Sequence, residues 1–290
     1  MNSKVRITHF MQVQQCATRP QIAAALSLSL VSTNAAVAAL EKEGVLEAGR
    51  LIPSGGGRPV REYHFNASHA AVALFSATPE AHCTLLQFEL LDLQGKLIEK
   101  TEARFVQLHA ESLDEWLDGA ARRQKIQRIC LPPGLGSGIL PHLQQRHQAS
   151  QVQEYYAVES LATHQENTLT LLLRQGQPPQ GVMHRNGRST PCPLLHLLPL
   201  PAEWETLNYA DHTLVEEMVA RLLQVLTCVL TPAHIKLYAD FWNDRLISRL
   251  NFNLSTKLRG IETPPHLHFA TINSDILAQK VRKSIARYIP

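Results

Sequence analysis

Residues 18–44 carry two helix starts separated by a short turn, and this spacing constrains the fold more than any other feature of the sequence. Thr18 and Gln21 have the spacing of a capping box, in which each side chain caps a backbone amide of the other residue. Ser29 is placed to cap a second helix, which Gly44 would end. Two short helices joined by a tight turn predict a helix-turn-helix.

Another helix and a β-hairpin are expected to flank this pair. A helix over residues 5–15 would precede it. The first strand of the hairpin would use residues 45–46 and 50–52, and the second would use residues 60–65. A flexible glycine-rich tip at 54–57 would join them. The pattern therefore predicts a winged helix-turn-helix over residues 1–66. The residues expected to face its core are Ile22, Ala25, Leu26, Thr33, Val37 and Leu40.

The chemistry of such a unit is DNA recognition. The start of the second helix would enter the major groove, where Asn34 can pair with an adenine edge, and the capped helix ends offer amides to phosphates. Arg58 lies between Gly57 and Pro59, so it would be held extended and can enter a narrow, A·T-rich minor groove. The DNA-binding residues predicted are Thr18, Arg19, Gln21, Ser29, Ser32, Asn34, Arg58 and Arg61. Two plainer interpretations remain: a helical packing module, and Arg58 as a solvated loop residue.

The distribution of net charge agrees with a DNA-binding segment at residues 1–66, but by itself it does not establish DNA binding. The chain carries a formal net charge of +3. Residues 1–66 hold seven basic and four acidic side chains, so the whole excess lies in this segment.

Composition bounds the remaining classes of protein. A chain of 290 residues with 44% hydrophobic residues can form two domains, and no apolar stretch is long enough to span a membrane. The first residues do not resemble a secretory signal, and five scattered cysteines without a Cys-x-x-Cys pair disfavour a disulfide framework or thiolate zinc site. We therefore expect a cytoplasmic protein.

Strands alternate with helices in the second predicted domain, residues 67–290, which favours an α/β sheet. The expected strands are 71–78, 82–91, 97–106, 126–131, 152–158, 169–174, 234–239 and 267–271, with a hairpin near 181–188. The expected helices are 112–123, 214–230 and 274–288.

Three strings carry a resemblance to a known family: residues 18–29, residues 37–46, and Gly56-Gly57-Arg58-Pro59. Together they resemble the winged-helix segment of ROK family repressors (repressors, open reading frames and sugar kinases). The resemblance covers residues 1–66 well, and the rest of the chain resembles the family in layout. It implies an α/β fold with an N-terminal winged helix-turn-helix and a degenerate actin-like domain, of the sugar-kinase and RNase H-like ATPase class.

The chemical motifs of the family's kinases are missing. The phosphate-loop position reads Phe75 to Pro79, without aspartate or glycine, and Glu159 is the nearest carboxylate to the place of the catalytic base. The glycine run 134–138 lacks the spacing of a phosphate cradle. His196 alone cannot form a zinc site, and His266 and His268 share a strand face with no third ligand nearby. Asp114, Glu115 and Asp118 are expected on a solvated helix face.

We therefore expect a DNA-binding transcriptional regulator, a repressor of sugar- or metabolite-related genes, with a non-catalytic effector and dimerisation domain. The expected partners are double-stranded DNA, a sugar or other metabolite if the effector domain binds one, and further copies of the chain, with helices 214–230 and 274–288 at the interface. No catalytic residue, cofactor, metal or membrane contact is expected. The alternatives are a divergent sugar kinase using Glu159 and a winged-helix protein-interaction module; an apolar face on the 29–43 helix would favour the latter.

Overall fold

The computed structural model describes residues 2–54, 57–80, 82–132, 139–147, 151–154, 157–163, 165–174, 179–192, 195, 211–261 and 263–287. The chain folds into two compact units. The first comprises Met1–Glu154 together with Arg282–Pro290, and the second comprises Tyr155–Val281. The domain division predicted between residues 66 and 67 remains a prediction.

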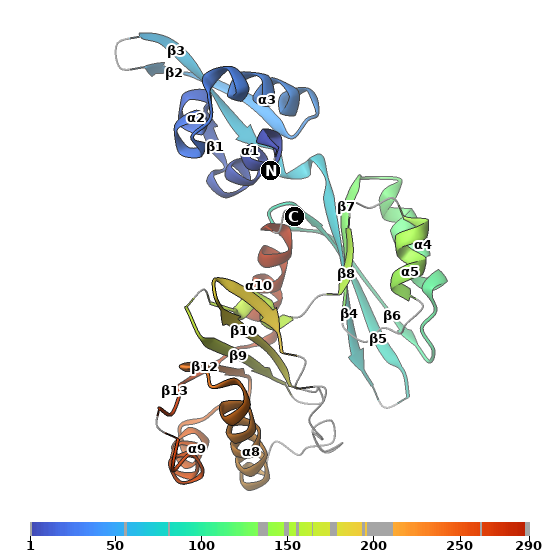
Figure 1. Ribbon diagram of the computed structural model, residues 1–290. Helices are drawn as coiled ribbons and strands as arrows, with labels where there is room; N and C mark the ends of the chain where they lie inside the picture. The colour runs from blue at the N-terminus through green and yellow to red at the C-terminus, as the bar shows by residue number, and fades with distance from the viewer. Residues whose placement is uncertain are drawn as a thin grey trace. The chain divides into compact units, whose positions relative to one another are not determined.

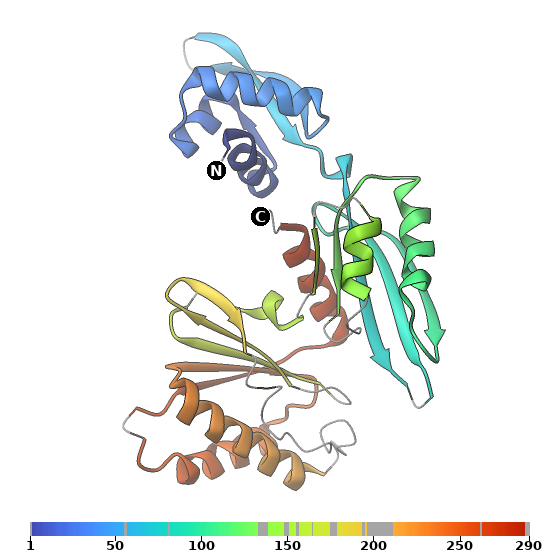
Figure 2. The ribbon, with the colours of Figure 1, turned by 45° about the vertical axis from the view of Figure 1, so that its right-hand side comes forward.

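Three helices and a small antiparallel sheet form the N-terminal part of the first unit (Figures 1 and 2). Their core is apolar and includes Ile7, Met11, Ile22, Val37 and Leu40. The strand order is β1–β3–β2, and β2 and β3 form a hairpin that reaches beyond the helices in both views. In chain order the elements are α1 (Ser3–Gln14), β1 (Cys16–Thr18), α2 (Arg19–Leu26), α3 (Leu30–Lys42), β2 (Leu46–Ser54) and β3 (Gly57–Phe65).

A five-stranded sheet forms the rest of the first unit. A short 3-10 helix, η1 (Ala67–His69), leads into β4 (Ala71–Pro79), which pairs antiparallel with β5 and parallel with β7. Helix α4 packs on the sheet, where Trp116 lies against the rings of Phe75 and Phe88. The remaining elements are β5 (Thr84–Asp92), β6 (Leu97–Phe105), α4 (Ala110–Ala121), β7 (Ile126–Leu131), α5 (Ile139–Arg146) and β8 (Gln151–Glu154).

The second unit is built on another five-stranded sheet. Its central strand β9 is buried along its whole length, and α8 and α9 contribute Leu223 and Leu250 to the core on one of its faces. The elements are η2 (Ala157–Leu161), β9 (Thr168–Leu173), β10 (Gln180–Arg185), β11 (Arg188–Pro191), α8 (His212–Leu230), β12 (His234–Ala239), α9 (Asp244–Lys257), β13 (His266–Thr271) and α10 (Ser274–Arg287).

The two large sheets have the same topology. Their strand orders, β6-β5-β4-β7-β8 and β11-β10-β9-β12-β13, both read third, second, first, fourth, fifth in chain order. In each sheet the first three strands pair antiparallel and the last two add in parallel, which requires helical crossovers. The mixed α/β architecture predicted from the sequence is therefore confirmed.

The end of α10 belongs to the first unit, although the helix begins in the second. Arg282 forms a two-pronged ion pair with Glu89 of β5, with Nε 2.8 Å from Oε2. Arg128 of β7 donates from Nη1 to the carbonyl of Ile285 at 2.9 Å. These cationic contacts suit the C-terminal end of a helix, where carbonyl groups lack partners within the helix.

Helix α1 and the turn between β5 and β6 also contact this helix end. Gln12 of α1 is buried, and its Nε2 donates to the carbonyl of Leu93 at 2.6 Å and to the carbonyl of Ala286. Gly95 has a φ of +80°, and a Cβ there would lie 2.7 Å from the carbonyl oxygen of Arg282. The turn can approach α10 this closely only because residue 95 has no side chain.

Some elements differ from those predicted. Residues 152–158 were predicted as one strand, but β8 ends at Glu154 and Val158 is a buried residue of η2. The sequence patterns did not predict β1, and α9 was also not predicted. No single helix among the described residues has the length and apolar character of a membrane span; α2 and α3 reach it only as a pair, bent by 119°.

Candidate nucleic-acid interface

Helix α2 begins at the predicted capping box. The Thr18 hydroxyl accepts from the amide of Gln21 at 3.4 Å, and the Gln21 side-chain oxygen accepts from the amide of Thr18 at 2.8 Å. Thr18 is only 3% exposed, because its side chain is turned into this cap. A contact of Thr18 with a phosphate would therefore run through the amides of the helix start.

Helix α3 begins at Ser29, as predicted, and its hydroxyl accepts from the amide of Ser32 at 3.1 Å. The turn before it is sharp because Ser27 adopts a left-handed conformation with a φ of 51°. Asn34 is exposed, as are Ser29 and Ser32. The predicted inward face is confirmed, since Thr33, Val37 and Leu40 are all buried.

The hairpin after α3 covers nearly the predicted residues, but its two strands are longer than predicted. Leu46 pairs with Phe65 at its base, and Gly57 pairs with Ser54 near its tip. Arg58 and Pro59 therefore belong to β3 and lie close to the hairpin tip rather than in a loop. Arg58 and Arg61 are both exposed.

Three basic side chains outside the hairpin have partners within residues 1–66. Lys4 pairs with Glu43, and Arg6 donates to the carbonyl of Leu26. The guanidinium of Arg19 lies 5.0 Å from the ring centroid of Tyr63 in a cation–π contact. The hairpin carries three exposed arginines, Arg50, Arg58 and Arg61, and Nε of Arg50 lies 3.8 Å from Oε2 of Glu62.

Two exposed residues were not singled out from the sequence. Leu30 and Val31, the first two residues of α3, are 55% and 79% exposed. Their position directly after the Ser29 cap could have indicated this, because the inward face of the helix begins only at Thr33. Ala25 was predicted to face the core but is exposed, and Ala23 is buried in its place.

The residues considered for sugar or phosphate chemistry are only partly described. The glycine run 134–138 and His196 lie outside the described residues. Glu159 lies in η2, and its burial raises the pKa of its carboxyl above the ordinary value of 4.5. At the position where a family kinase would carry its phosphate loop, β4 continues as regular strand to Pro79, which pairs with Thr84 of β5.

A third histidine does accompany His266 and His268, contrary to the prediction. His234 of β12 pairs with His266 in the sheet, and its ring centroid lies 5.3 Å from that of His266 and 5.9 Å from that of His268. The ring of His234 stacks on that of His266 and is tilted against that of His268. Among the residues that the structure describes, no group of three or more His, Cys, Asp or Glu side chains could hold a metal ion.

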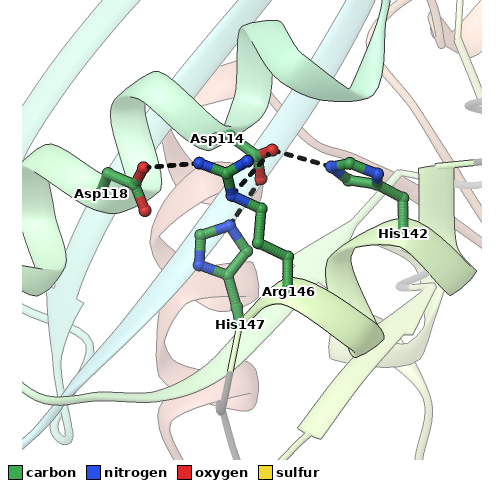
Figure 3. A network of polar contacts seen from close by, with 5 residues as sticks. All are labelled: Asp114, Asp118, His142, Arg146 and His147. Carbon is green, nitrogen blue, oxygen red and sulfur yellow. Dashed lines mark hydrogen bonds and ion pairs between the residues drawn. The ribbon is translucent and has the colours of Figure 1, made fainter.

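Asp114 was predicted on a solvated face, and this was wrong. The residue is 3% exposed because α5 packs over α4 at this point (Figure 3). Its carboxylate accepts hydrogen bonds from Nε2 of His142 at 2.8 Å and from Nε2 of His147 at 2.6 Å. Arg146 lies between the two aspartates: its Nε is 3.2 Å from Oδ2 of Asp114, and its Nη2 is 3.2 Å from Oδ2 of Asp118.

This network predicts a stability effect at acid pH. Burial raises the pKa of Asp114, but the hydrogen bonds from His142 and His147 and the charge of Arg146 outweigh it, so the pKa falls below its ordinary 3.8. The stabilisation is therefore complete above about pH 4 and is lost as the pH falls through the lower pKa of the folded state. Asp114→Asn should lower the free energy of unfolding by about 1–2 kcal/mol at pH 7.

Urea unfolding at a series of pH values checks this. The difference between wild type and Asp114→Asn should shrink as the pH falls below about 4. Asp118→Asn is the matched control, since Asp118 is less buried and shares only Arg146; we expect at most about 0.5 kcal/mol. A difference that does not change with pH would contradict the assigned role of the Asp114 charge.

Comparison with known proteins reveals the fold. No protein-family model and no curated protein matches the sequence. In contrast, 99% of the chain superposes on 96% of a solved ROK family transcriptional regulator, a homologue of the E. coli MLC protein, with a TM-score of 0.60 and 11% identity.

Shorter matches include a ROK family protein from Streptococcus pneumoniae in complex with sucrose and a ROK hexokinase from Thermus thermophilus. Each covers 73% of this chain and 97% of its own at 14% identity, with TM-scores of 0.49 and 0.45, which are too low to support further conclusions. The full-length match shows that the chain has the mixed α/β fold of a ROK family regulator. The resemblance to the ROK family that the sequence indicated is confirmed at the level of the fold.

Proposed function

We propose that the protein is a DNA-binding transcriptional regulator, a repressor of sugar- or metabolite-related genes. Residues 1–66 are its winged helix-turn-helix, and residues 67–290 are its effector and assembly domain. One observation carries this proposal. The start of α3 is capped, uncharged and exposed, and the hairpin that follows the helix carries exposed arginines. A fold shared along the full chain with a transcriptional regulator supports it.

Each side chain has a role that its placement permits. Helix α3 enters the major groove, where Asn34 pairs with adenine and Ser32 makes a lesser contact. The amides at the starts of α2 and α3 bind phosphates, positioned by the caps at Thr18, Gln21 and Ser29. Arg61 contacts the backbone, and Arg19, held over Tyr63, does so beside the start of α2.

Arg58 is assigned to the minor groove. It is an exposed residue near the tip of a hairpin that extends past the helices. A narrow groove over A·T pairs concentrates negative potential, and an arginine at the end of a thin hairpin can enter it. The operator is thus expected to place an A·T-rich segment beside each major-groove site.

The effector domain acts in this proposal without catalysis. Phosphoryl transfer needs a loop that cradles phosphates and a base near the acceptor hydroxyl. Regular strand extends to Pro79 where the first would lie, and a sugar or other metabolite would bind as an effector only. We expect a dimer or higher homo-oligomer, because a two-fold operator requires two copies of α3.

One observation favours a second candidate, a divergent sugar kinase. Glu159 is partly buried with a raised pKa, as a general base requires. ATP consumption with a panel of hexoses tests it, and loss of that activity in Glu159→Gln would assign the base. Without detectable nucleotide binding, this candidate fails.

Selection of genomic fragments by the full-length protein tests the main proposal. At roughly 150 mM salt the enriched fragment should bind about a thousandfold more tightly than a scrambled duplex of the same composition. Binding should weaken at least about tenfold between roughly 50 and 200 mM salt, because phosphate contacts release counterions. If no fragment exceeds random DNA, the proposal is wrong.

A further inference from the structure

The start of α3 is apolar and exposed, which a helix on a protein surface does not require. Leu30 and Val31 are 55% and 79% exposed, while the Ser29 cap fixes the helix start through the amide of Ser32. No charged residue lies between Leu30 and Leu40. This end of the helix therefore offers shape and apolar surface rather than charge.

The exposed surface continues as a narrow strip along the helix. Val31, Ala35 and Ala38 are all exposed, and their spacing of four and three residues places them on one face. Asn34 is exposed three residues after Val31 and adjoins the strip. On this strip the large apolar side chain of Val31 is followed by two small ones, Ala35 and Ala38, and the side-chain amide of Asn34 lies beside them.

We infer that Val31 contacts the C5-methyl groups of thymine in the major groove, next to the base pair that Asn34 reads. This inference rests on the proposed DNA-binding function and assigns part of its sequence preference. Thymine is the only base that presents a methyl group in the major groove, and apolar side chains recognise it by contact. The alanines at 35 and 38 let the helix backbone approach the bases closely enough for that contact.

A protein partner would fit the same surface poorly. A helix that docks in an apolar groove uses large anchors at positions i, i+4 and i+7. Counted from Val31, those positions are Ala35 and Ala38, so only one anchor is large. The exposed arginines on the adjoining hairpin, Arg58 and Arg61, suit a polyanion instead.

Replacing thymine by uracil in the operator removes only the methyl group, so it tests this contact directly. The operator is the duplex enriched from genomic fragments, and each thymine of one half-site is replaced singly by uracil. For the full-length wild type we expect one such replacement to weaken binding about fourfold, the worth of one buried methyl group. Val31→Ala should weaken binding to the thymine operator similarly and bind thymine and uracil duplexes equally.

Val13→Ala is the matched control. Val13 is also an exposed valine, 56% exposed, but lies near the end of α1, so this variant should keep wild-type affinity and thymine preference. The inference is overturned if the wild type binds the operator tightly without any thymine preference. It is equally overturned if Val31→Ala keeps both affinity and preference, in which case the apolar end of α3 serves a protein contact. If no DNA is bound at all, the proposed function fails with it.

Discussion

Replacing Arg58 by alanine should weaken operator binding by about ten- to a hundredfold and leave the free energy of unfolding within about 0.5 kcal/mol of the wild type. The binding loss is expected because Arg58 stands near the tip of the β2–β3 hairpin, where a guanidinium can enter the minor groove. Stability should be unchanged because the residue is exposed and lies outside the buried core.

Binding curves with two duplexes distinguish a minor-groove contact of Arg58 from a non-specific effect of its positive charge. One duplex keeps the A·T-rich segment next to the major-groove site, and the other replaces it with G·C pairs. The wild type should prefer the first, and Arg58→Lys, which keeps the charge but has a more strongly hydrated head group, should lose most of that preference. Arg188→Ala, at an exposed position in β11, is the control and should bind as the wild type does. Unchanged affinity in Arg58→Ala would remove the minor-groove role.

Gly95→Ala should lower the free energy of unfolding by about 2–5 kcal/mol. Two costs add at this position. A φ of +80° is unfavourable for any residue with a Cβ, by about 1–2 kcal/mol. The new Cβ would also lie 2.7 Å from the backbone oxygen of Arg282, and such overpacking typically costs about 1–3 kcal/mol.

Gly44→Ala isolates the first of these costs. Gly44 lies in the same unit and has a similar φ of +75°, but a Cβ there would meet nothing within 4 Å. We expect this control to lose only about 1–2 kcal/mol in the same urea titration. If the two variants were equally destabilised, the turn and α10 would be able to separate at little cost, contrary to the close packing described.

Local signals in the sequence were sufficient to predict α2 and α3, the two helices that begin with a capping residue. Thr18, Gln21 and Ser29 act through neighbours three residues away, so their pattern is readable without knowledge of the fold. The long strands β4 and β5 were also predictable, because they are apolar over most of their length. Strand β1, with only three residues, has no periodicity to read and forms because β3 pairs with it.

Tertiary contacts explain what the sequence could not indicate. Asp114 reads as a surface acid on α4, and only the packing of α5 brings His142 and His147 against it. His234 likewise meets His266 because β12 and β13 pair in register, although 32 residues separate them in number.

The last helix also determines when the first unit can be completed during synthesis. Arg128 and Ile285 bond across 157 residues of chain, and Gln12 and Ala286 across 274. At translation rates of about 5–20 residues per second, the ribosome needs on the order of 10 s after β8 to make residues 282–287. During that interval the carbonyl groups of Ile285 and Ala286, to which Arg128 and Gln12 donate in the folded protein, do not yet exist, so the first unit reaches its final packing only after the second unit has been synthesised.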